Sequence, residues 1–274
     1  MRSKAACLSV AALATVAIAA CQRQPSPEPA EKVAPPAAAP QPPAPIAAPQ
    51  PVDRSELLRS LDTAASVYAA GKAPEGEVLT GRRFTVRQAF GCTGPAPPPP
   101  ADLAADGLPR WSWGSERRTI EIRLTPSDWA KSALIAGNDG AWEAAEGFWL
   151  TRPWLRADGC PAPRVDPLAG PTAPSPQTMG IAAVFERGGS RLGRRNGRAY
   201  AFTVRGEGDQ PPLLPVGGYR LVLEGRFVAF ADGRAIRCRS AAADQRPVCV
   251  AATELDRVAF EDAGGAVLSE WRAG

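Results

Sequence analysis

The stretch Tyr219–Ala231, YRLVLEGRFVAFA, is a long run in which apolar and polar positions alternate. A period of two places successive side chains on opposite faces of a strand, so this run predicts a β-strand with one buried face. The dipeptide Asp232-Gly233 follows directly and is a strong signal for a tight hairpin turn. We therefore expect the chain to turn there and continue into a second strand over Ala235–Ser240.

Short alternating runs recur on both sides of this predicted hairpin. About ten short strands, with turn signals between them and few helices, argue against βαβ units and favour an antiparallel sandwich or barrel. We expect Ile181–Glu186 and Ala199–Arg205 to pair with each other across the loop that joins them. The remaining predicted strands are Arg83–Ala89, Thr119–Leu124, Gly147–Leu155, Val248–Thr253, Arg257–Glu261 and Ala266–Trp271.

Two segments carry helical signals. Asp53 and Glu56 have the spacing of a capping box, an apolar stripe at helical spacing follows, and Gly71 supplies a residue that ends helices. These features predict an N-terminal amphipathic helix over Ser55–Ala70. A second, short helix is predicted over 125–136, because a threonine, a proline and an acid stand at cap, first-turn and third positions. The expected fold is mainly β with this N-terminal helix and one or two short helices.

The N-terminus has the three parts of a secretory signal. Arg2 and Lys4 give a positive start, the segment 5–20 is apolar except for one serine and one threonine, and small residues precede Cys21. The segment Ile18-Ala19-Ala20-Cys21 resembles the lipobox of bacterial lipoproteins. That resemblance implies cleavage before Cys21 and acylation of this cysteine. Gln22 stands where Asp favours inner-membrane retention in enteric bacteria, so the resemblance implies the outer membrane, with the chain facing the periplasm.

A proline- and alanine-rich stretch separates Cys21 from the predicted helix. Residues 22–52 contain 11 prolines and 8 alanines, which favours an extended linker that could reach about 90 Å. A second proline-rich stretch, Pro161–Pro176, is expected to be a surface loop, although it could divide the globular part in two. The sequence thus predicts a signal peptide at 1–20, a lipidated cysteine with its linker at 21–52, a helix at 53–71 and a β-rich globular domain at 72–274.

Four cysteines follow Cys21, an even number that indicates disulfides in an exported chain. They allow three connectivities. We favour Cys238–Cys249 with Cys92–Cys160, because the first pair lies on what is expected to be one hairpin. Closing a loop of about 12 residues contributes about 3 kcal/mol.

Composition excludes several classes of function. The chain contains no histidine and no CxxC, so neither Ser-His-Asp or Cys-His catalysis nor a zinc site is expected. No nucleotide-binding motif is present, and no cofactor is expected. Without Arg2 and Lys4, 30 basic residues stand against 28 acidic ones, a balance that does not indicate nucleic-acid binding. Carboxylate chemistry remains open, and its candidates, which we expect to be solvated surface acids, are Glu143, Glu146, Asp256, Glu261 and Asp262.

Two features are candidates for binding. Trp111 and Trp113 would point to one face of a strand and could form an aromatic platform, although core packing is the simpler role. The loop 187–198 is dense in guanidiniums, which could meet phosphates or acidic polymers unless it is only a solvated hairpin end. The arginines of this loop are Arg187, Arg191, Arg194, Arg195 and Arg198.

Two functions from different classes follow. The first is a non-enzymatic lipoprotein, anchored in the outer membrane, that binds an envelope partner such as a protein, peptidoglycan or lipopolysaccharide. The alternative is a carboxylate-dependent hydrolase of envelope polysaccharide, which needs two carboxyl groups about 5 to 10 Å apart in a cleft.

Overall fold

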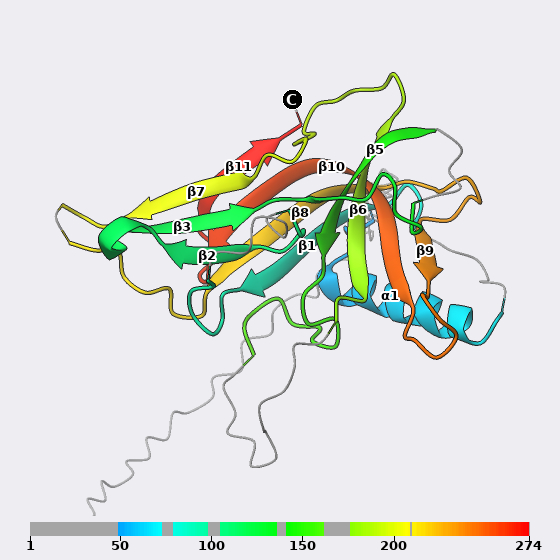
Figure 1. Ribbon diagram of the computed structural model, residues 1–274, viewed down its shortest axis with the longest axis horizontal. Helices are drawn as coiled ribbons and strands as arrows, with labels where there is room; N and C mark the ends of the chain where they lie inside the picture. The colour runs from blue at the N-terminus through cyan, green and yellow to red at the C-terminus, as the bar shows by residue number, and fades with distance from the viewer. Residues whose placement is uncertain are drawn as a thin grey trace, which may run out of the picture. The chain divides into compact units, whose positions relative to one another are not determined.

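The computed structural model describes residues 49–72, 79–97, 105–135, 141–161, 176–208 and 210–273 (Figure 1). Cys21, the predicted signal peptide, most of the linker and most of the loop Pro161–Pro176 lie outside these residues. Within them the fold is mainly β, as predicted, with one α-helix and two sheets, neither of which closes into a barrel.

The larger sheet has eight strands in the order β1-β8-β10-β6-β5-β4, with β9 and β11 also paired to β10. The smaller sheet has the order β2-β3-β7. The strands of the larger sheet are β1 (Arg83–Phe90), β4 (Ser127–Asp128), β5 (Trp142–Trp149), β6 (Met179–Glu186), β8 (Tyr219–Phe227), β9 (Ile236–Arg239), β10 (Val248–Asp262) and β11 (Val267–Arg272). Those of the smaller sheet are β2 (Arg110–Trp113), β3 (Thr119–Leu124) and β7 (Tyr200–Arg205), and a 3₁₀ turn, η2 (Ser115–Arg117), joins β2 to β3.

Strand β10 changes its neighbours along its length, and Figure 1 shows it curving through the sheet. On one edge it pairs first with β9, over Val248–Ala251, and then with β8, over Thr253–Asp262. On the other edge it pairs first in parallel with β6, over Cys249–Thr253, and then with β11, over Arg257–Glu261. A β-bulge between Leu255 and Arg257 lies at the change, where bulges bend a strand.

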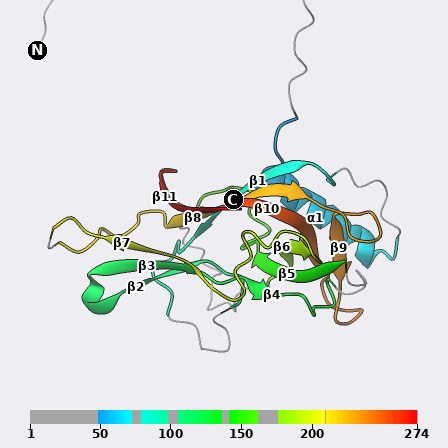
Figure 2. The same cartoon turned by 90° about the horizontal axis from the view of Figure 1, so that it is seen from above.

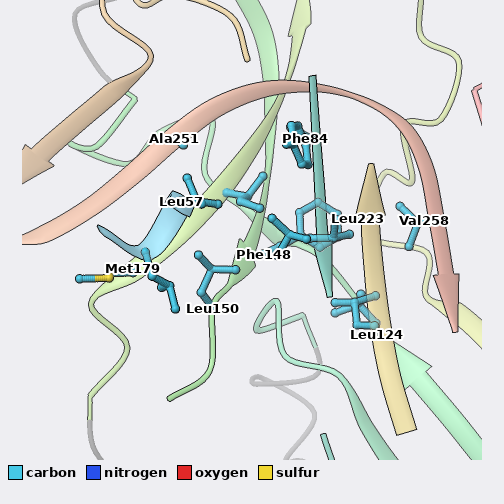
Figure 3. Packing of buried hydrophobic residues seen from close by; sticks show 14 of the residues in the cluster. Leu57, Phe84, Leu124, Phe148, Leu150, Met179, Leu223, Ala251 and Val258 are labelled. Atoms are coloured by element: carbon cyan, nitrogen blue, oxygen red, sulfur yellow. The ribbon is translucent and has the colours of Figure 1, made fainter. Parts of the chain in front are cut away.

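One face of the larger sheet is covered by two different elements. The small sheet covers one end, and helix α1 (Arg54–Ala69) covers the other, where it contacts β9, β10 and β1 (Figure 2). Leu57 of α1, Leu124 of β3, Phe148 of β5 and Leu223 of β8 belong to the same buried cluster (Figure 3). The result is a sandwich-like packing in which burial of apolar side chains from both covers supplies most of the stabilisation.

Helix α1 is fixed at its first turn. The Asp53 carboxylate accepts the Glu56 backbone N–H at 2.8 Å, the N-cap bond that helix starts require. Arg54 is 2 % exposed and donates to Gln88 Oε1 at 3.3 Å and to the backbone carbonyl of Thr151 at 2.6 Å. Burial lowers the pKa of Arg54 to about 10. This guanidinium ties the start of α1 to β1 and to the segment after β5.

The prediction of a short helix over 125–136 is wrong in the part of that segment that the structure describes, residues 125–135. Ser127 and Asp128 pair with β5 as strand β4, and residues 130–135 form turns. The cause is tertiary packing: Trp129 lies so close to Gly147 and Gly180 that a Cβ at either would collide with its ring. Local capping signals are weak compared with burial of a tryptophan.

The predicted strand pairing is also corrected. Ile181–Glu186 and Ala199–Arg205 do not pair with each other, because β6 pairs with β5 and β10 while β7 pairs with β3 in the other sheet. The predicted strand Gly147–Leu155 is instead β5, which ends at Trp149, before Pro153. After Leu150, whose N–H donates to the Met179 carbonyl, the chain enters a turn in which Arg152 has φ 50°.

The turn at Asp232-Gly233 is present, but it does not close a hairpin between paired strands. The Gly233 N–H donates to the Phe230 carbonyl at 2.8 Å, and Gly233 has φ 81°. Strands β8 and β9 both pair antiparallel to β10, one after the other along the same edge. The segment between them folds back, and Phe230 joins a second buried cluster with Trp129, Ala182 and Val250 on the far face of the sheet.

Both predicted disulfides are present. Cys238 lies directly opposite Cys249 in the β9–β10 register, with their Cα atoms 4.1 Å apart. Cys92 and Cys160 are joined with a Cα separation of 5.5 Å, which links the end of β1 to the segment after β5. Among the described residues no helix is both long enough and apolar enough to cross a bilayer.

Candidate functional site

A pocket opens where β6 and β11 share one edge of β10. β6 leaves that edge after Thr253, and β11 joins it at Arg257, so neither strand pairs with the bulge between them. The loop 187–198 lies over this opening, and Figure 1 shows it beside the C-terminal end of β11. The resulting cavity has a volume of about 400 Å³. We call it the arginine pocket, and it is lined by the loop, the β10 bulge, Tyr200 and the ends of β6 and β11.

Glu143 of β5 neutralises one side of the loop. Its carboxylate accepts Arg191 Nε at 2.8 Å and Arg191 Nη2 at 3.0 Å, and it also accepts Arg194 Nη1 at 3.0 Å. The bidentate geometry is that of strong guanidinium–carboxylate pairs. These hydrogen bonds, with the charges of the two arginines, hold the pKa of Glu143 below its ordinary value. The expectation of a solvated Glu143 is wrong, because its side chain is only 17 % exposed and is occupied by the loop.

Glu146, three residues further along β5, holds the turn of the loop. Its Oε1 accepts the backbone N–H groups of Arg195 and Asn196, both at 2.8 Å. Asn196 has φ 51°, a left-handed conformation that asparagine tolerates better than most residues. Glu146 is only 7 % exposed, so the expectation of a solvated acid is wrong here too. Burial raises the pKa of Glu146, although the two backbone bonds oppose that shift.

Arg195 and Arg198 differ from the other arginines of the pocket. The Arg195 guanidinium lies 4.6 Å from the centre of the Tyr200 ring and donates to the Ala199 carbonyl at 2.6 Å. Arg198 Nε donates to the Arg195 carbonyl at 3.2 Å. No carboxylate of the described residues forms an ion pair with either guanidinium. Both therefore stand at the wall of a cavity without a carboxylate in ion-pair contact, although the charge of Glu146 acts on Arg195 at longer range.

The opposite wall is made by β10 and β11. Arg257 pairs with Glu224 at 2.9 Å and with Glu270 at 2.7 Å, and Arg272 pairs with Glu270 at 3.0 Å. Trp271, on the opposite face of β11 from Glu270 and Arg272, packs edge-on against Tyr200, with ring centres 5.1 Å apart. This wall thus presents guanidiniums beside an aromatic surface.

The described lining of the pocket is rich in arginines, although four of them are paired with Glu143, Glu224 or Glu270 just outside it. Six arginines contribute to it, against two carboxylates, Glu146 and Asp256. Such a cavity favours phosphate, sulfate or carboxylate groups, which guanidiniums recognise by paired hydrogen bonds. Arg187 does not line the pocket; its backbone N–H donates to the Ala141 carbonyl at the base of the loop.

Four of these arginines were predicted from the sequence as candidates for binding, but the residues of the opposite wall were not. Arg257, Trp271 and Arg272 lie in predicted strands, where a charged or aromatic residue is ordinary. Tyr200 carried no signal either, although burial raises the pKa of its hydroxyl. Only the sheet register, which brings β11 beside the end of β6, reveals these four residues as neighbours.

The proposed aromatic platform is wrong. Trp111 is 1 % exposed, and its Nε1 donates to the Gly91 carbonyl at 3.4 Å. Trp113 packs edge-on against it, with ring centres 5.9 Å apart, and contacts the same buried cluster. Both point inward from β2 because alternation along the strand directs them to the core.

The other candidate carboxylates are occupied by protein partners. Asp256 pairs with Arg83 at 2.8 Å, and buried Glu261 lies 3.5 Å from Arg87. Asp262 accepts the Ala266 N–H at 2.9 Å. In the part of the chain that the structure describes, no group of three or more acids or cysteines is arranged to hold a metal ion.

Comparison with known proteins adds no assignment, because no known family, curated protein or solved structure matches the chain. Function is therefore inferred from the pocket and from the sequence.

Proposed function

We propose that the protein is a non-enzymatic lipoprotein of the cell envelope, and that it binds an anionic envelope partner through the arginine pocket. The observation that carries this proposal is the pair Arg195 and Arg198, which line the cavity without a described carboxylate partner. The ligand class is a phosphate- or carboxylate-bearing group, as found on lipopolysaccharide, peptidoglycan or an acidic segment of an envelope protein. Trp271, which lines the pocket and is partly exposed, offers an aromatic surface to the uncharged part of such a ligand.

The predicted anchor supports this location. Cys21 follows an apolar run and two small residues, and it precedes a linker long enough to hold the domain away from the bilayer. Acyl chains on Cys21 would keep the protein at the membrane, and Gln22 favours the outer one, facing the periplasm. Replacing Cys21 with serine should abolish labelling by a fatty-acid probe. Labelling that persists in Cys21→Ser would refute the anchor.

Binding is tested by changing only the more exposed arginine of the pair Arg195 and Arg198. Arg198→Gln should weaken retention on lipopolysaccharide or peptidoglycan about tenfold, the effect of losing one charge-assisted hydrogen bond of about 1.5 kcal/mol. Arg205→Gln, at the exposed end of β7 and outside the pocket, is the matched control and should change little. Retention should also fall with salt. Equal retention of both variants and the parent protein would mean that the pocket does not bind these anions.

One observation favours the alternative of a hydrolase. Glu146 and Asp256 both line the pocket, and burial raises the pKa of Glu146 as a general acid would require. Their present roles as acceptors for the loop and for Arg83 favour binding instead. Incubation with purified peptidoglycan and lipopolysaccharide should release no soluble saccharide. Release by the parent protein that is lost in both Glu146→Gln and Asp256→Asn would establish the hydrolase and overturn the non-enzymatic proposal.

A further inference from the structure

A second hollow lies at the other end of the larger sheet, between α1 and β9. It has a volume of about 520 Å³, and we call it the α1–β9 groove. One wall is the flank of α1 that includes Ser60, Thr63 and Val67, and the other is β9 with the turn before it. Leu57, Leu58 and Leu61 point into the core, so the adjacent flank of the helix, with its small side chains, leaves the space open.

The floor of the groove is apolar. It includes Ala64, Val67 and Leu79 on the helix side, and Ile236 and Cys238 on the strand side. The disulfide between Cys238 and Cys249 fixes the β9 wall to β10. An apolar floor with a fixed wall suits a hydrocarbon segment, because apolar surface is there to be covered and the shape is preformed.

The rim of the groove is cationic. Among its described residues, six basic side chains stand against two carboxylates, Glu56 and Asp232. Glu56 pairs with Arg82, and Asp232 pairs with Arg234 at 2.8 Å. Both carboxylates are therefore already occupied within the rim.

Three of the rim cations have no such partner. Arg59, Lys72 and Arg239 are exposed, and no carboxylate of the described residues forms an ion pair with them. They belong to both walls, since Arg59 lies on α1, Lys72 follows it, and Arg239 ends β9. Cations therefore stand on both walls of the groove, but Arg59 and Lys72 do not reach one head group together, because the ten residues after Arg59 to the end of α1 alone span about 15 Å.

We infer that the α1–β9 groove binds an amphipathic anion, with a hydrocarbon segment on the apolar floor and a phosphate or carboxylate head group on the cationic rim. The site lies apart from the arginine pocket and does not depend on it. The two hollows share no lining residue, and the groove offers a single head group both a charged rim and an apolar floor. A fatty acid or a single-chain phospholipid has this chemistry.

The test uses the full chain carrying Cys21→Ser, so that its own acyl chains do not compete. Calorimetric titration with dodecyl phosphate is compared with inorganic phosphate and with dodecyl maltoside, all below their micelle concentrations. Dodecyl phosphate should bind at least tenfold more tightly than either of the others. Equal binding of inorganic phosphate would indicate a plain anion site, and equal binding of the maltoside would indicate a plain apolar site. Either outcome overturns the inference, as does the absence of binding.

Variants locate the site. Arg59→Gln combined with Arg239→Gln should weaken dodecyl phosphate binding about tenfold or more, since each charged hydrogen bond contributes about 1.5 kcal/mol or more. Thr63→Trp should block the groove, because Thr63 is exposed on its wall and tolerates a larger side chain. Arg198→Gln, in the arginine pocket, should leave this binding unchanged. Weakening by Arg198→Gln alone would place the amphiphile in the arginine pocket and overturn the groove.

Discussion

The two halves of β10 both bury apolar residues in the same core, but what holds their edges differs. The first half lies between β9 and β6, is joined to β9 by the Cys238–Cys249 disulfide, and is covered by the leucines of α1. The second half lies between β8 and β11, and its bulge forms the floor of a pocket whose walls carry ion pairs. Apolar burial and a covalent bond are insensitive to salt, whereas ion pairs near the surface are screened. The candidate site lies on the half whose edge carries these ion pairs, although Val258 and Phe260 bury that half in the core as well.

The largest predicted loss of stability comes from replacing Arg54, and it tests whether α1 stabilises the first half of β10. Arg54→Met should lower the free energy of unfolding by about 3 to 5 kcal/mol, because carbonyls such as that of Thr151 would lose a buried donor. Arg59→Met on the exposed side of the same helix should change it by less than about 0.5 kcal/mol. Urea unfolding followed by tryptophan fluorescence measures both. Similar midpoints for the two variants would contradict the anchoring role.

The second-largest predicted loss of stability comes from removing the disulfide of the first half of β10. Replacing both Cys238 and Cys249 with alanine should cost about 3 kcal/mol, the value for a short closed loop. The unfolding midpoint should fall, while the salt dependence of stability should stay that of the parent protein, since no charge is removed. If the stability of this variant depended on salt differently from that of the parent protein, the proposed difference between the two halves of β10 would be wrong.

Glu146 tests the second half. Glu146→Ala should cost about 1 to 3 kcal/mol, because the backbone N–H groups of Arg195 and Asn196 lose their acceptor in a buried place. Glu146→Gln keeps an oxygen acceptor and should cost less than half as much. If both variants lose the same amount, the negative charge and not the hydrogen bonding holds the loop.

The smallest predicted effects are on the pH dependence of stability, to which Glu143 and Glu146 of β5 contribute with opposite signs. The pKa of Glu143 is lowered from 4.5, so its contribution is present above that pH and is lost on acidification. The pKa of Glu146 is raised from 4.5, so its folded form binds a proton more tightly and acidification through that range adds stability. Between pH 7 and about 4, the melting temperature should therefore fall less in Glu143→Gln than in the parent, and more in Glu146→Gln. Scanning calorimetry at several pH values checks both signs, and equal slopes would refute them.

Much of the fold follows from local pattern. The predicted strands Arg83–Ala89 and Thr119–Leu124 are β1 and β3 almost unchanged, because alternation reports which face of a strand is buried. The predicted strands Val248–Thr253 and Arg257–Glu261 proved to be one strand with a bulge. Pairing partners could not be predicted, since alternation does not encode which strand lies alongside.

The candidate site was half predictable. A cluster of arginines in one loop is visible in any sequence, but its counterions Glu143 and Glu146 lie on β5, far away in the chain. Only the packing of β5 beside β6 brings them beneath the loop. The groove between α1 and β9 was not anticipated at all, because its cations are scattered singly along three segments.

The pairing of β1 with β8 has a kinetic consequence. Arg83 lies opposite Arg226, so the first strand of the larger sheet waits for a partner from near the end of the chain. Contacts of such long sequence separation form slowly, because closing the intervening chain costs entropy before any ladder bond is made. If the chain is synthesised and exported N-terminus first, one edge of β1 lacks its ladder partner until β8 has emerged, while the other edge has only the short bridge to Val52. During that interval the open edge of β1 can pair with another molecule, and a chaperone that covers this edge would prevent such pairing.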